Sequence, residues 1–536
     1  MSTEDKLRLV REWLSAKGLD ALVVPTDDPH GSEYPAEHWQ CRRWLTGFTG
    51  SAGTAVVTAT EALLWTDSRY WLQAEEQLAG TEFRLMRDGE DVDIQTWLDA
   101  HAPKALWSYN EPFSSIWPDR PALPLTPAWI MPDGVAGESA ADKLHRLVVF
   151  LRDKGMPGIL VSDLAEVAWL LNIRGNDIAY NPFIISFLYV SADGAHVLYV
   201  HRQQVEGIRD YLASLGVSVK PYDETLVQQC GPTPVAAWKA VKNPVEQAGF
   251  RRAHLRDGVA MVRFLIRLQR ELERGSHITE MWVDRELTAL RAAGEGFLSL
   301  SFETIAGYAA HGAIVHYEAT AETDVTLQRG GLLLLDSGAH YDCGTTDITR
   351  TIALGTPTEE ERRVYTLVLK GHLQLQAMRF PEGTTGLQLD TAARMAMWRE
   401  GYDFGHGTGH GVGHVLGVHE GPAQIRKNHR ADTVLPLCAG QVVTDEPGIY
   451  VAGRFGVRIE NCLLCVPSGC TDFGNFLAFE PLTLCPYDRS LIVPEMLSTE
   501  ELSWLNAYHG MVSDRLMPLL TDETERTWLR DATRPL

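Results

Sequence analysis

The stretch GLLLLDSGAHYDCGTTDITRT, residues 331–351, decides what kind of domain the second half of the chain forms. Four consecutive leucines indicate a buried strand with Asp336 at its end, and a buried carboxylate needs a partner that offsets its desolvation. Asp347 lies in an alternating, strand-like segment, and Gly338 and Gly344 favour a hairpin between the two aspartates. Across a hairpin their Cβ atoms could face one another at about 5 Å, where two carboxylates repel unless a cation or proton intervenes. Taken singly, either aspartate is equally well explained as a turn residue.

A second segment, GHGTGHGVGHVLGVHEGP at 405–422, is rich in glycine and histidine. The glycines allow close backbone approach and weaken a helix, so the segment is expected to be strand or loop. A lone histidine usually has no special role, but four in so short a stretch predict at least one metal ligand. The four are His406, His410, His414 and His419.

A third segment, VVTDEPGIYVAGRFGVRIEN at 442–461, brings two further acids into strand-like sequence. Its apolar alternation places Glu446 and Glu460 on two strands joined by a turn rich in glycine and proline. Acidic residues are disfavoured in strands, so both glutamates need a reason. By itself the segment could equally be a solvent-facing ladder of salt bridges. Arg458, beside Glu460, can hold a carboxylate in place.

Together the three segments offer four carboxylates and one imidazole, which could balance the charge of two divalent cations. Two metals about 3.5–4 Å apart can share a hydroxide, lower the pKa of bound water and stabilise a hydrolytic transition state. Oxygen-rich ligation with one imidazole suits manganese, with iron, cobalt or zinc as alternatives. The predicted ligands are Asp336, Asp347, His410, Glu446 and Glu460.

The first half of the chain contains an internal repeat. LRLVREWLSAKGLDALVVPT (7–26) resembles LHRLVVFLRDKGMPGILVSD (144–163), and each copy is a helix, a glycine stop and an apolar strand. Each copy is followed by further strands and another helix, which predicts two α/β domains in tandem. From about 243 long helices and antiparallel strands indicate an α+β domain, and capped helices are expected in the tail. The predicted domains are 1–136, 137–242, 243–485 and 486–536.

Composition limits the environment and the partners. With 48 basic and 70 acidic residues the net charge is −22, which disfavours nucleic acid and anionic membranes. The sequence contains no apolar run of about 18 residues, so no transmembrane helix is predicted. The N-terminus lacks the pattern of a signal peptide. Eight scattered cysteines indicate free thiols in the cytoplasm. Cys462 and Cys465 lie three apart in a predicted strand, on opposite faces, which disfavours a zinc site there.

Six motifs resemble the pita-bread metallopeptidases. They are DSG (336–338), TTDITRT (345–351), GHGTGHGVG (405–413), VHEGP (418–422), TDEPGIY (444–450) and VRIEN (457–461). Within that family the chain is similar to aminopeptidase P of the long, three-domain, cytosolic type, and the similarity extends to PTDDPHGSEY (25–34) and LNIRGNDIAYNP (171–182). The resemblance implies two creatinase-N-terminal-like α/β domains before a pita-bread catalytic domain.

The resemblance also implies an activity, namely hydrolysis of the first peptide bond in peptides with proline at the second position, by a hydroxide bridging two metals. Asp336 would bind one metal, Asp347 and Glu460 would bridge both, and His410 and Glu446 would hold the other. Glu446 would also accept the proton of the attacking water. A homodimer is expected by resemblance.

Further roles follow from the same resemblance. His316 would bind the substrate near the scissile bond, and His419 would stabilise the tetrahedral intermediate or transfer protons. His406 would line the proline pocket, and Arg458 is counted with it as substrate-binding. His414 is expected to be a bystander.

Several alternatives share parts of this pattern. A prolidase, limited to Xaa-Pro dipeptides, has the same ligands, but the chain length and the tandem repeat favour the aminopeptidase. A methionine aminopeptidase would leave two domains unexplained. A catalytically silent binding module typically lacks the ligand set, and a creatinase-like, metal-free C–N hydrolase departs from it at the ligand positions.

Overall fold

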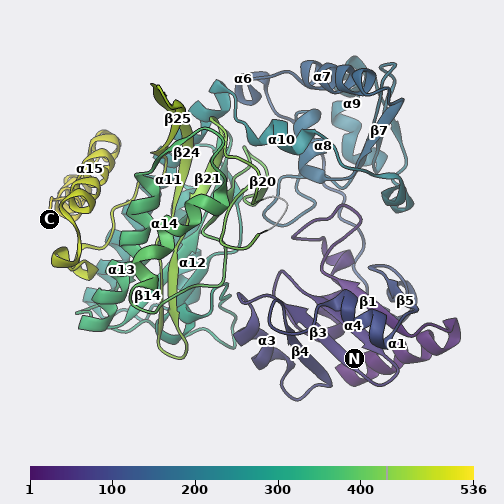
Figure 1. Ribbon diagram of the computed structural model, residues 1–536, viewed down its shortest axis with the longest axis horizontal. Coiled ribbons are helices and arrows are strands. Elements are labelled where there is room, and N and C mark those ends of the chain that lie inside the picture. Colours follow the sequence, from purple (N-terminus) through teal and green to yellow (C-terminus); the bar gives the residue numbers. More distant parts are fainter. Residues whose placement is uncertain (430–432) are drawn as a thin grey trace. The chain divides into compact units, whose positions relative to one another are not determined.

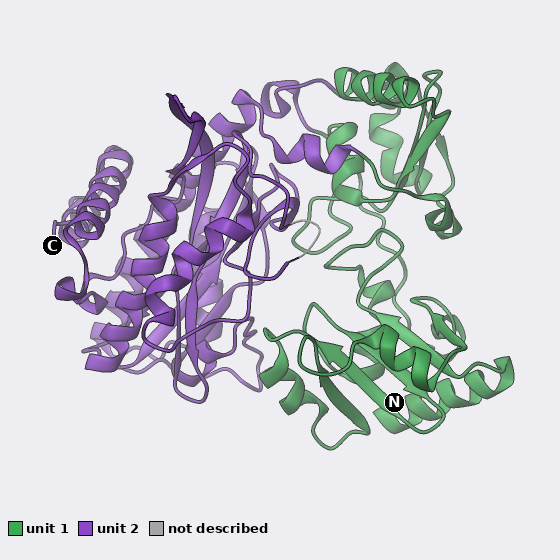
Figure 2. Cartoon of the chain, viewed as in Figure 1, with its two compact units in different colours: residues 1–130, 140–233 green, residues 131–139, 234–536 purple. Residues whose placement is uncertain are grey.

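The computed structural model describes residues 1–429 and 433–536, which fall into two units (Figure 2). The smaller unit comprises 1–130 and 140–233, and the larger comprises 131–139 and 234–536. Residues 131–139 belong with the larger unit partly because Asn243 Nδ2 donates a hydrogen bond to the Ala136 carbonyl. The units divide the chain differently from the four predicted domains, whose boundaries remain predictions.

The two copies of the predicted repeat each build a sheet in the smaller unit. Their strand orders are β4-β3-β2-β1-β5 and β11-β10-β9-β7. In both sheets the first three strands of the copy pair antiparallel and the third pairs parallel with the fourth. The strands are β1 (Ala21–Pro25), β2 (Thr54–Thr58), β3 (Ala62–Thr66), β4 (Phe83–Arg87) and β5 (Ala105–Trp107), then β7 (Gly158–Val161), β9 (Phe187–Ser191), β10 (His196–Tyr199) and β11 (Val217–Lys220).

The helices of the repeat follow the predicted pattern with one exception. α1 (Thr3–Lys17) ends at Gly18, which has the left-handed φ of 66° that glycine adopts freely, and α7 (Ala140–Asp153) opens the second copy. The predicted helix after β3 is α3 (Trp71–Leu78). The second predicted helix of the second copy, QQVEGIRDYL (203–212), is helical but is not one α-helix, because a 3₁₀ helix η2 (Arg202–Ile208) precedes α9 (Arg209–Ser214). Gly207 inside this segment weakens an α-helix.

The larger unit contains four long helices, two of which begin with a capping box that contains a glutamate (Figure 1). Asn243 and Glu246 form a reciprocal capping box, as do Thr358 and Glu361, so two orphan backbone donors are satisfied at each start. The helices are α11 (Pro244–Arg274), α12 (Glu280–Ala292), α13 (Glu359–Gln376) and α14 (Gly386–Trp398).

The strands of the larger unit all pair antiparallel within the described residues, which confirms the predicted α+β class. A six-stranded sheet has the order β18-β25-β24-β21-β19-β20, and a three-stranded sheet has the order β13-β14-β17. Their strands are β13 (Ile305–Tyr308), β14 (Leu332–Ser337), β17 (Ile348–Ala353), β18 (Arg379–Pro381), β19 (Gly409–Gly411), β20 (Glu420–Ile425), β21 (Val442–Asp445), β24 (Asn461–Thr471) and β25 (Gly474–Pro481).

The hairpin predicted around Gly338 and Gly344 is present, but its register differs from the simplest expectation. Asp336 in β14 lies opposite Thr349 in β17, whereas Asp347 stands one residue before β17. The residues between the two strands are not a tight turn, since they form β15 (Ala339–Tyr341) and β16 (Gly344–Thr345). The two aspartates are therefore diagonal neighbours rather than a directly opposed pair.

The other two acids stand at the ends of neighbouring strands. Glu446 directly follows β21 and Glu460 directly precedes β24, and the intervening residues form the hairpin of β22 (Gly448–Val451) and β23 (Phe455–Arg458). Asp445 and Asn461, one residue further into the sheet, are partners in the β21–β24 ladder.

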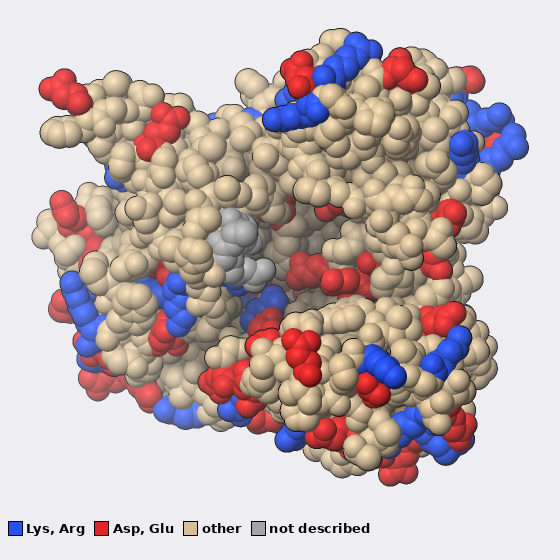
Figure 3. Space-filling model, turned by 45° about the vertical axis from the view of Figure 1, so that its right-hand side comes forward, with Lys and Arg blue, Asp and Glu red and all other residues tan. Residues whose placement is uncertain are grey.

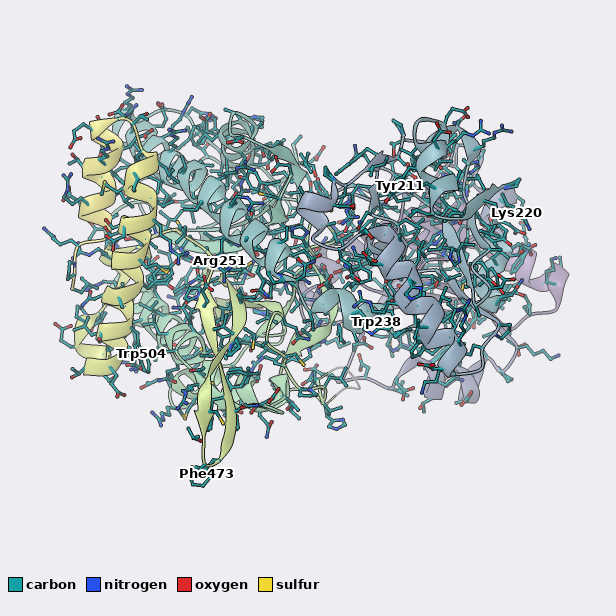
Figure 4. The ribbon with its side chains drawn as sticks, turned by 90° about the horizontal axis from the view of Figure 1, so that it is seen from above. Tyr211, Lys220, Trp238, Arg251, Phe473 and Trp504 are labelled. Carbon is teal, nitrogen blue, oxygen red and sulfur yellow. The ribbon has the colours of Figure 1, made fainter. Side chains whose placement is uncertain are left out.

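The C-terminal segment folds as two helices, α15 (Thr499–Leu516) and α16 (Glu523–Ala532), and α15 begins at the predicted capping box of Ser498 and Glu501. In Figure 4 these yellow helices lie at one end of the larger unit, with Trp504 on α15 and Phe473 at the tip of the β24–β25 hairpin. Leu505, Val512 and Leu516 are buried in one core with residues of α13.

Two expectations from composition can be compared with the structure. None of the described helices is both long and apolar enough to cross a membrane. All eight cysteines are free thiols, and Cys462 and Cys465 pack into separate hydrophobic clusters, as alternation along β24 requires.

A matched pair of glycines tests the packing of the larger unit. A methyl group at Gly371 in α13 would overlap the Ala393 carbonyl of α14, whereas Gly510 in α15 has open space around it. Gly371→Ala should therefore cost about 1–3 kcal/mol through overpacking, and Gly510→Ala should add about 0.5–1 kcal/mol through helix propensity. Thermal unfolding of the metal-free variants measures both. Equal effects at the two sites would contradict the close helix crossing.

Candidate metal centre

Three side chains from separate segments converge where β17, β19 and β24 meet. Ligand atoms of Asp347, His410 and Glu460 all lie within 4.8 Å of one another. Many acidic side chains of the chain lie on its surface, as the face in Figure 3 shows. Asp347 and Glu460 instead have only 3% and 1% of their surface exposed. This convergence is the geometry that the sequence predicts for a metal site.

His410 is oriented by its backbone surroundings. Its Nδ1 donates to the Gly411 carbonyl at 2.9 Å, so in the neutral ring, the form that binds a metal, Nε2 carries the lone pair. That Nε2 lies 3.5 Å from Asp347 Oδ2 and 3.6 Å from Glu446 Oε1. Metal-binding histidines characteristically donate their other ring N–H to a carbonyl or carboxylate, which fixes the ring.

The carboxylates of the cluster raise one another's pKa values, because neighbouring negative charges repel. The pKa of Asp336 is raised to about 6, mainly by burial and also by the charges of Asp347 and Glu446, which together outweigh the lowering by Arg458. Burial, followed by the charges of Asp347 and Asp336, raises the pKa of Glu460 well above its usual range. For His410, burial lowers the pKa, but Asp347 and Glu446 outweigh this and raise it to about 9. The cluster thus attracts positive charge.

Polar groups bind one carboxylate oxygen of Glu460 and one of Asp336. Thr349 Oγ1 donates to Glu460 Oε2 at 2.8 Å, and the Arg458 guanidinium donates to Asp336 Oδ2 at 2.7 Å. Asp336 Oδ1 is buried with no hydrogen-bond partner. An unpaired buried carboxylate oxygen is costly unless a cation binds it.

The residues present fit divalent cations. Asp336, Asp347 and Glu460 are buried, while His410 and Glu446 are half-buried, so the cluster is closed behind and accessible on one side. Oxygen donors with one imidazole suit hard or borderline divalent ions. Access on one side is what a catalytic site needs, because substrate must reach the ions.

A hydrogen-bonded chain leads from Asp336 to the predicted proline pocket. Arg458 Nη1 donates to the Tyr450 hydroxyl at 2.8 Å, and that hydroxyl lies 2.7 Å from His406 Nε2. His406 Nδ1 donates to the Gly407 carbonyl, so the Tyr450 hydroxyl is the donor to Nε2. Arg458 therefore holds a carboxylate, as its charge suggests, while its predicted contact with substrate stays a prediction.

The other predicted histidines occupy different surroundings. The His419 ring stands edge-on to His410 with the ring centroids 4.3 Å apart. His316 is half-buried in the loop after η4 (Ala309–Ala313), next to Tyr317. His414 Nε2 donates to the Cys343 carbonyl at 2.9 Å and packs against Phe250.

A buried glutamate anchors the loop that carries His316. Glu280 accepts hydrogen bonds from the Tyr308 N–H at 2.7 Å and the Tyr317 hydroxyl at 2.8 Å, and its carboxylate also contacts His311 Nδ1 at 2.9 Å. Both ends of the loop are thus attached to the first turn of α12. This restricts where His316 can lie.

Two supporting residues escaped the sequence analysis. Thr349 shares a strand face with Asp347 at a spacing of two, which is a signal that the sequence did offer. Tyr450 stands inside the quoted motif TDEPGIY, but only the fold brings its hydroxyl between Arg458 and His406.

Comparison with known proteins gives matches along almost the whole chain. Residues 248–467 match the model of metallopeptidase family M24, and 475–536 match that of the C-terminal region of peptidase M24. Residues 6–108 and 119–231 match two models of the creatinase/prolidase N-terminal domain. The tandem repeat is therefore a pair of creatinase-like domains, as the resemblance implied.

Individual relatives extend over the full length. An aminopeptidase P1 of Lotus japonicus is 35% identical and covers 99% of this chain and 100% of its own. A probable Xaa-Pro aminopeptidase P of Laccaria bicolor is 36% identical over 100% of this chain and 94% of its own.

A solved structure agrees with these sequences. The X-prolyl aminopeptidase of Caenorhabditis elegans, described as a cytosolic enzyme with a di-nuclear active site, is 33% identical and superposes with a TM-score of 0.94 over 100% of both chains. Family, length and pita-bread fold coincide with the ligand cluster described above. This chain is therefore a hydrolase of metallopeptidase family M24 and belongs to its aminopeptidase P branch.

Proposed function

We propose that this protein removes the first residue from peptides that have proline at the second position, with two divalent metal ions at the cluster. The observation that carries the proposal is the convergence of Asp347, His410 and Glu460, with Asp336 and Glu446 beside them. Its setting in a chain similar along its full length to Xaa-Pro aminopeptidases, one of them di-nuclear, supports the substrate class.

The five ligands divide between the two ions in the proposed site. Asp336 would hold one ion, His410 and Glu446 would hold the other, and Asp347 and Glu460 would be shared between them. The burial of Asp347 and Glu460 supports this division, because both are carboxylates of the group of mutually close atoms and each has a second oxygen for a second ion. Four carboxylates with one imidazole favour manganese, and zinc, cobalt and iron remain alternatives.

When bound, the ions would supply a hydroxide shared between them at neutral pH and polarise the scissile carbonyl. Glu446 accepts the proton of the attacking water, since its carboxylate is the half-buried one. His419, edge-on to His410, stabilises the tetrahedral oxyanion or transfers the proton to the leaving nitrogen. His316 binds the substrate next to the scissile bond from its anchored loop.

In this proposal proline is recognised at His406, where the chain of hydrogen bonds from Asp336 through Arg458 and Tyr450 ends. A peptide bond to proline is a tertiary amide without an N–H, so a dedicated pocket replaces a hydrogen bond to that group. His406 lies between the rings of Phe404 and Tyr450, at centroid distances of 4.8 and 5.4 Å, which gives a largely apolar surface for a pyrrolidine ring. Arg458 contacts substrate from the same side in this proposal.

The description of one relative supports a location, and the family resemblance supports a state of assembly. We propose a cytosolic enzyme, as the Caenorhabditis elegans protein is described. The homodimer expected from the family resemblance is part of the same proposal.

The decisive experiment compares three peptides with manganese-loaded protein. Arg-Pro-Pro should be cleaved to arginine and Pro-Pro, Arg-Pro should be cleaved poorly, and Arg-Ala-Pro tests the need for proline. Chromatography of the products and metal analysis of the protein give the result. Cleavage of the dipeptide alone would establish a prolidase, absence of both metal and hydrolysis a silent binding module, and hydrolysis without metal a creatinase-like reaction.

Metal binding should couple to stability through Glu460. Glu460→Gln keeps an acceptor for Thr349 and removes one charge from the repelling cluster, so the metal-free variant should melt at the same temperature as the parent or higher. Manganese at about 100 times its Kd should stabilise the parent by about 2.7 kcal/mol, and the variant much less.

The matched control is Glu480→Gln in β25, where the carboxylate pairs with Arg251 away from the cluster. It should keep the full stabilisation by manganese. A Glu460→Gln protein that is stabilised as strongly as the parent would show that Glu460 is not a ligand.

Substitution of His419 and of His414, both in the segment 405–422, should affect turnover differently. His419→Gln should lower kcat by about 10²-fold, the usual size of a general acid–base contribution, without changing metal content. His414→Gln removes a ring that bonds the Cys343 carbonyl, so kcat per folded molecule should stay at the parent value. Loss of metal in the His419 variant would mean that its assigned role is wrong.

A further inference from the structure

The strands that carry Glu446 and Glu460 have a second, inward face that the proposed chemistry does not use. Asp445 and Asn461 are each adjacent to a proposed ligand, are paired across the β21–β24 ladder and are fully buried. Because side chains alternate along a strand, these two point away from the ligand cluster. What they contact controls how firmly the ligand-bearing strand ends are held.

Arg350 donates several of the hydrogen bonds that connect the groups on this inward face. It is 1% exposed, and its Nη1 donates to the Glu460 carbonyl at 2.7 Å and the Thr349 carbonyl at 2.9 Å. Its Nη2 donates to Asn461 Oδ1 at 2.9 Å, and a planar guanidinium holds such partners in fixed directions. One side chain thus fixes the backbone of Glu460 and the side chain beside it.

The remaining acceptors of Arg350 come from the C-terminal region. The Cys485 carbonyl and the Tyr508 hydroxyl each lie 2.8 Å from Nη2, and the Pro486 carbonyl lies 3.3 Å from Nε. Tyr508 is on α15, 158 positions from Arg350 in the sequence. The helix therefore reaches the layer directly behind a proposed bridging ligand.

A second tyrosine of the C-terminal region connects the two ligand-bearing strands. The Tyr487 hydroxyl accepts from Asn461 Nδ2 at 3.0 Å and lies 2.8 Å from His372 Nε2. The other ring nitrogen of His372, Nδ1, donates to the Asp445 backbone carbonyl at 3.2 Å and also lies 3.2 Å from Asp445 Oδ2. Tyr487 also stacks on Tyr508 with the ring centroids 4.7 Å apart, so the two tyrosines support one another.

We propose that Tyr508 and Tyr487 are positioning residues for the metal site, so that the C-terminal region sets metal affinity without touching metal or substrate. Partners behind metal ligands orient those ligands, and their loss typically weakens binding about 10–100-fold. Tyr508 acts on the Glu460 side through Arg350. Tyr487 acts on both sides, through Asn461 and through His372 and Asp445. The inference rests on the proposed function, because it requires Glu446 and Glu460 to bind metal.

The test is titration of manganese into metal-free protein by calorimetry, for the parent and for Tyr508→Phe, which keeps the stacked ring and removes only the hydroxyl. Kd for manganese should rise about tenfold, the lower end of the range for partners behind ligands. At saturating manganese, kcat and KM for Arg-Pro-Pro should return to the parent values. A defect in affinity that excess metal repairs distinguishes positioning from general damage to the fold.

Tyr365→Phe is the matched control. Tyr365 is equally buried and its hydroxyl accepts one hydrogen bond, from the Asp488 N–H, without bonding to Arg350 or Asn461. It should lower the melting temperature of metal-free protein, by less than Tyr508→Phe because its hydroxyl makes fewer hydrogen bonds, and it should leave Kd unchanged. Should Tyr508→Phe fail to fold, Tyr487→Phe is titrated in its place with the same expected rise in Kd.

Each outcome decides between the claims. Parent-like Kd in the tyrosine variant, or an equal rise in Kd for Tyr365→Phe, overturns the positioning role while leaving the proposed function intact. A parent that binds no manganese defeats both the proposed function and this inference.

Discussion

Four acidic side chains, most of them buried, repel one another at the centre of the proposed site, and the larger unit must hold them together against this repulsion. Arg458 donates hydrogen bonds to this cluster, but its guanidinium occupies only one oxygen of Asp336. Protons can neutralise part of the cluster, as the raised pKa values of Asp336 and Glu460 show. Divalent ions neutralise it more fully, because each cancels two charges at once. Binding of metal ions would thus offset the electrostatic cost of bringing the acids together.

The fold holds the acids in place by putting each at the end of a strand. Asp336, Glu446 and Glu460 end or begin strands whose other residues are fixed by ladders of hydrogen bonds. Strand ends combine a rigid backbone with side chains that project past the sheet, which suits a precise but accessible site. The two-residue period then forces the neighbouring positions, Asp445 and Asn461, to face inward.

Local features of this fold could be predicted from the sequence, because they depend on neighbours in the chain. Capping residues placed the starts of α11, α13 and α15, and leucine runs and glycines placed the hairpin of β14 and β17. The proposed carboxylate ligands could be recognised as acids in strand-like sequence, and the proposed imidazole ligand from its glycine- and histidine-rich segment. The exact register, with Asp336 opposite Thr349 instead of Asp347, depends on β15 and β16 pairing between the two strands. The 3₁₀ turn at 202–208 likewise depends on packing that a local pattern does not record.

Contacts between distant segments were beyond prediction for a different reason. Tyr508 looks like an ordinary apolar position of an amphipathic helix, and its hydroxyl acquires meaning only beside Arg350. The segment around Cys485 and Pro486 is irregular, so its carbonyls need donors from elsewhere. Arg350 supplies those donors, and α15 covers the segment from solvent. The same contacts satisfy the buried backbone and support the strand of Glu460, so stability and metal positioning are served by one set of hydrogen bonds. A helix that carries no ligand can thus belong to the working part of the enzyme.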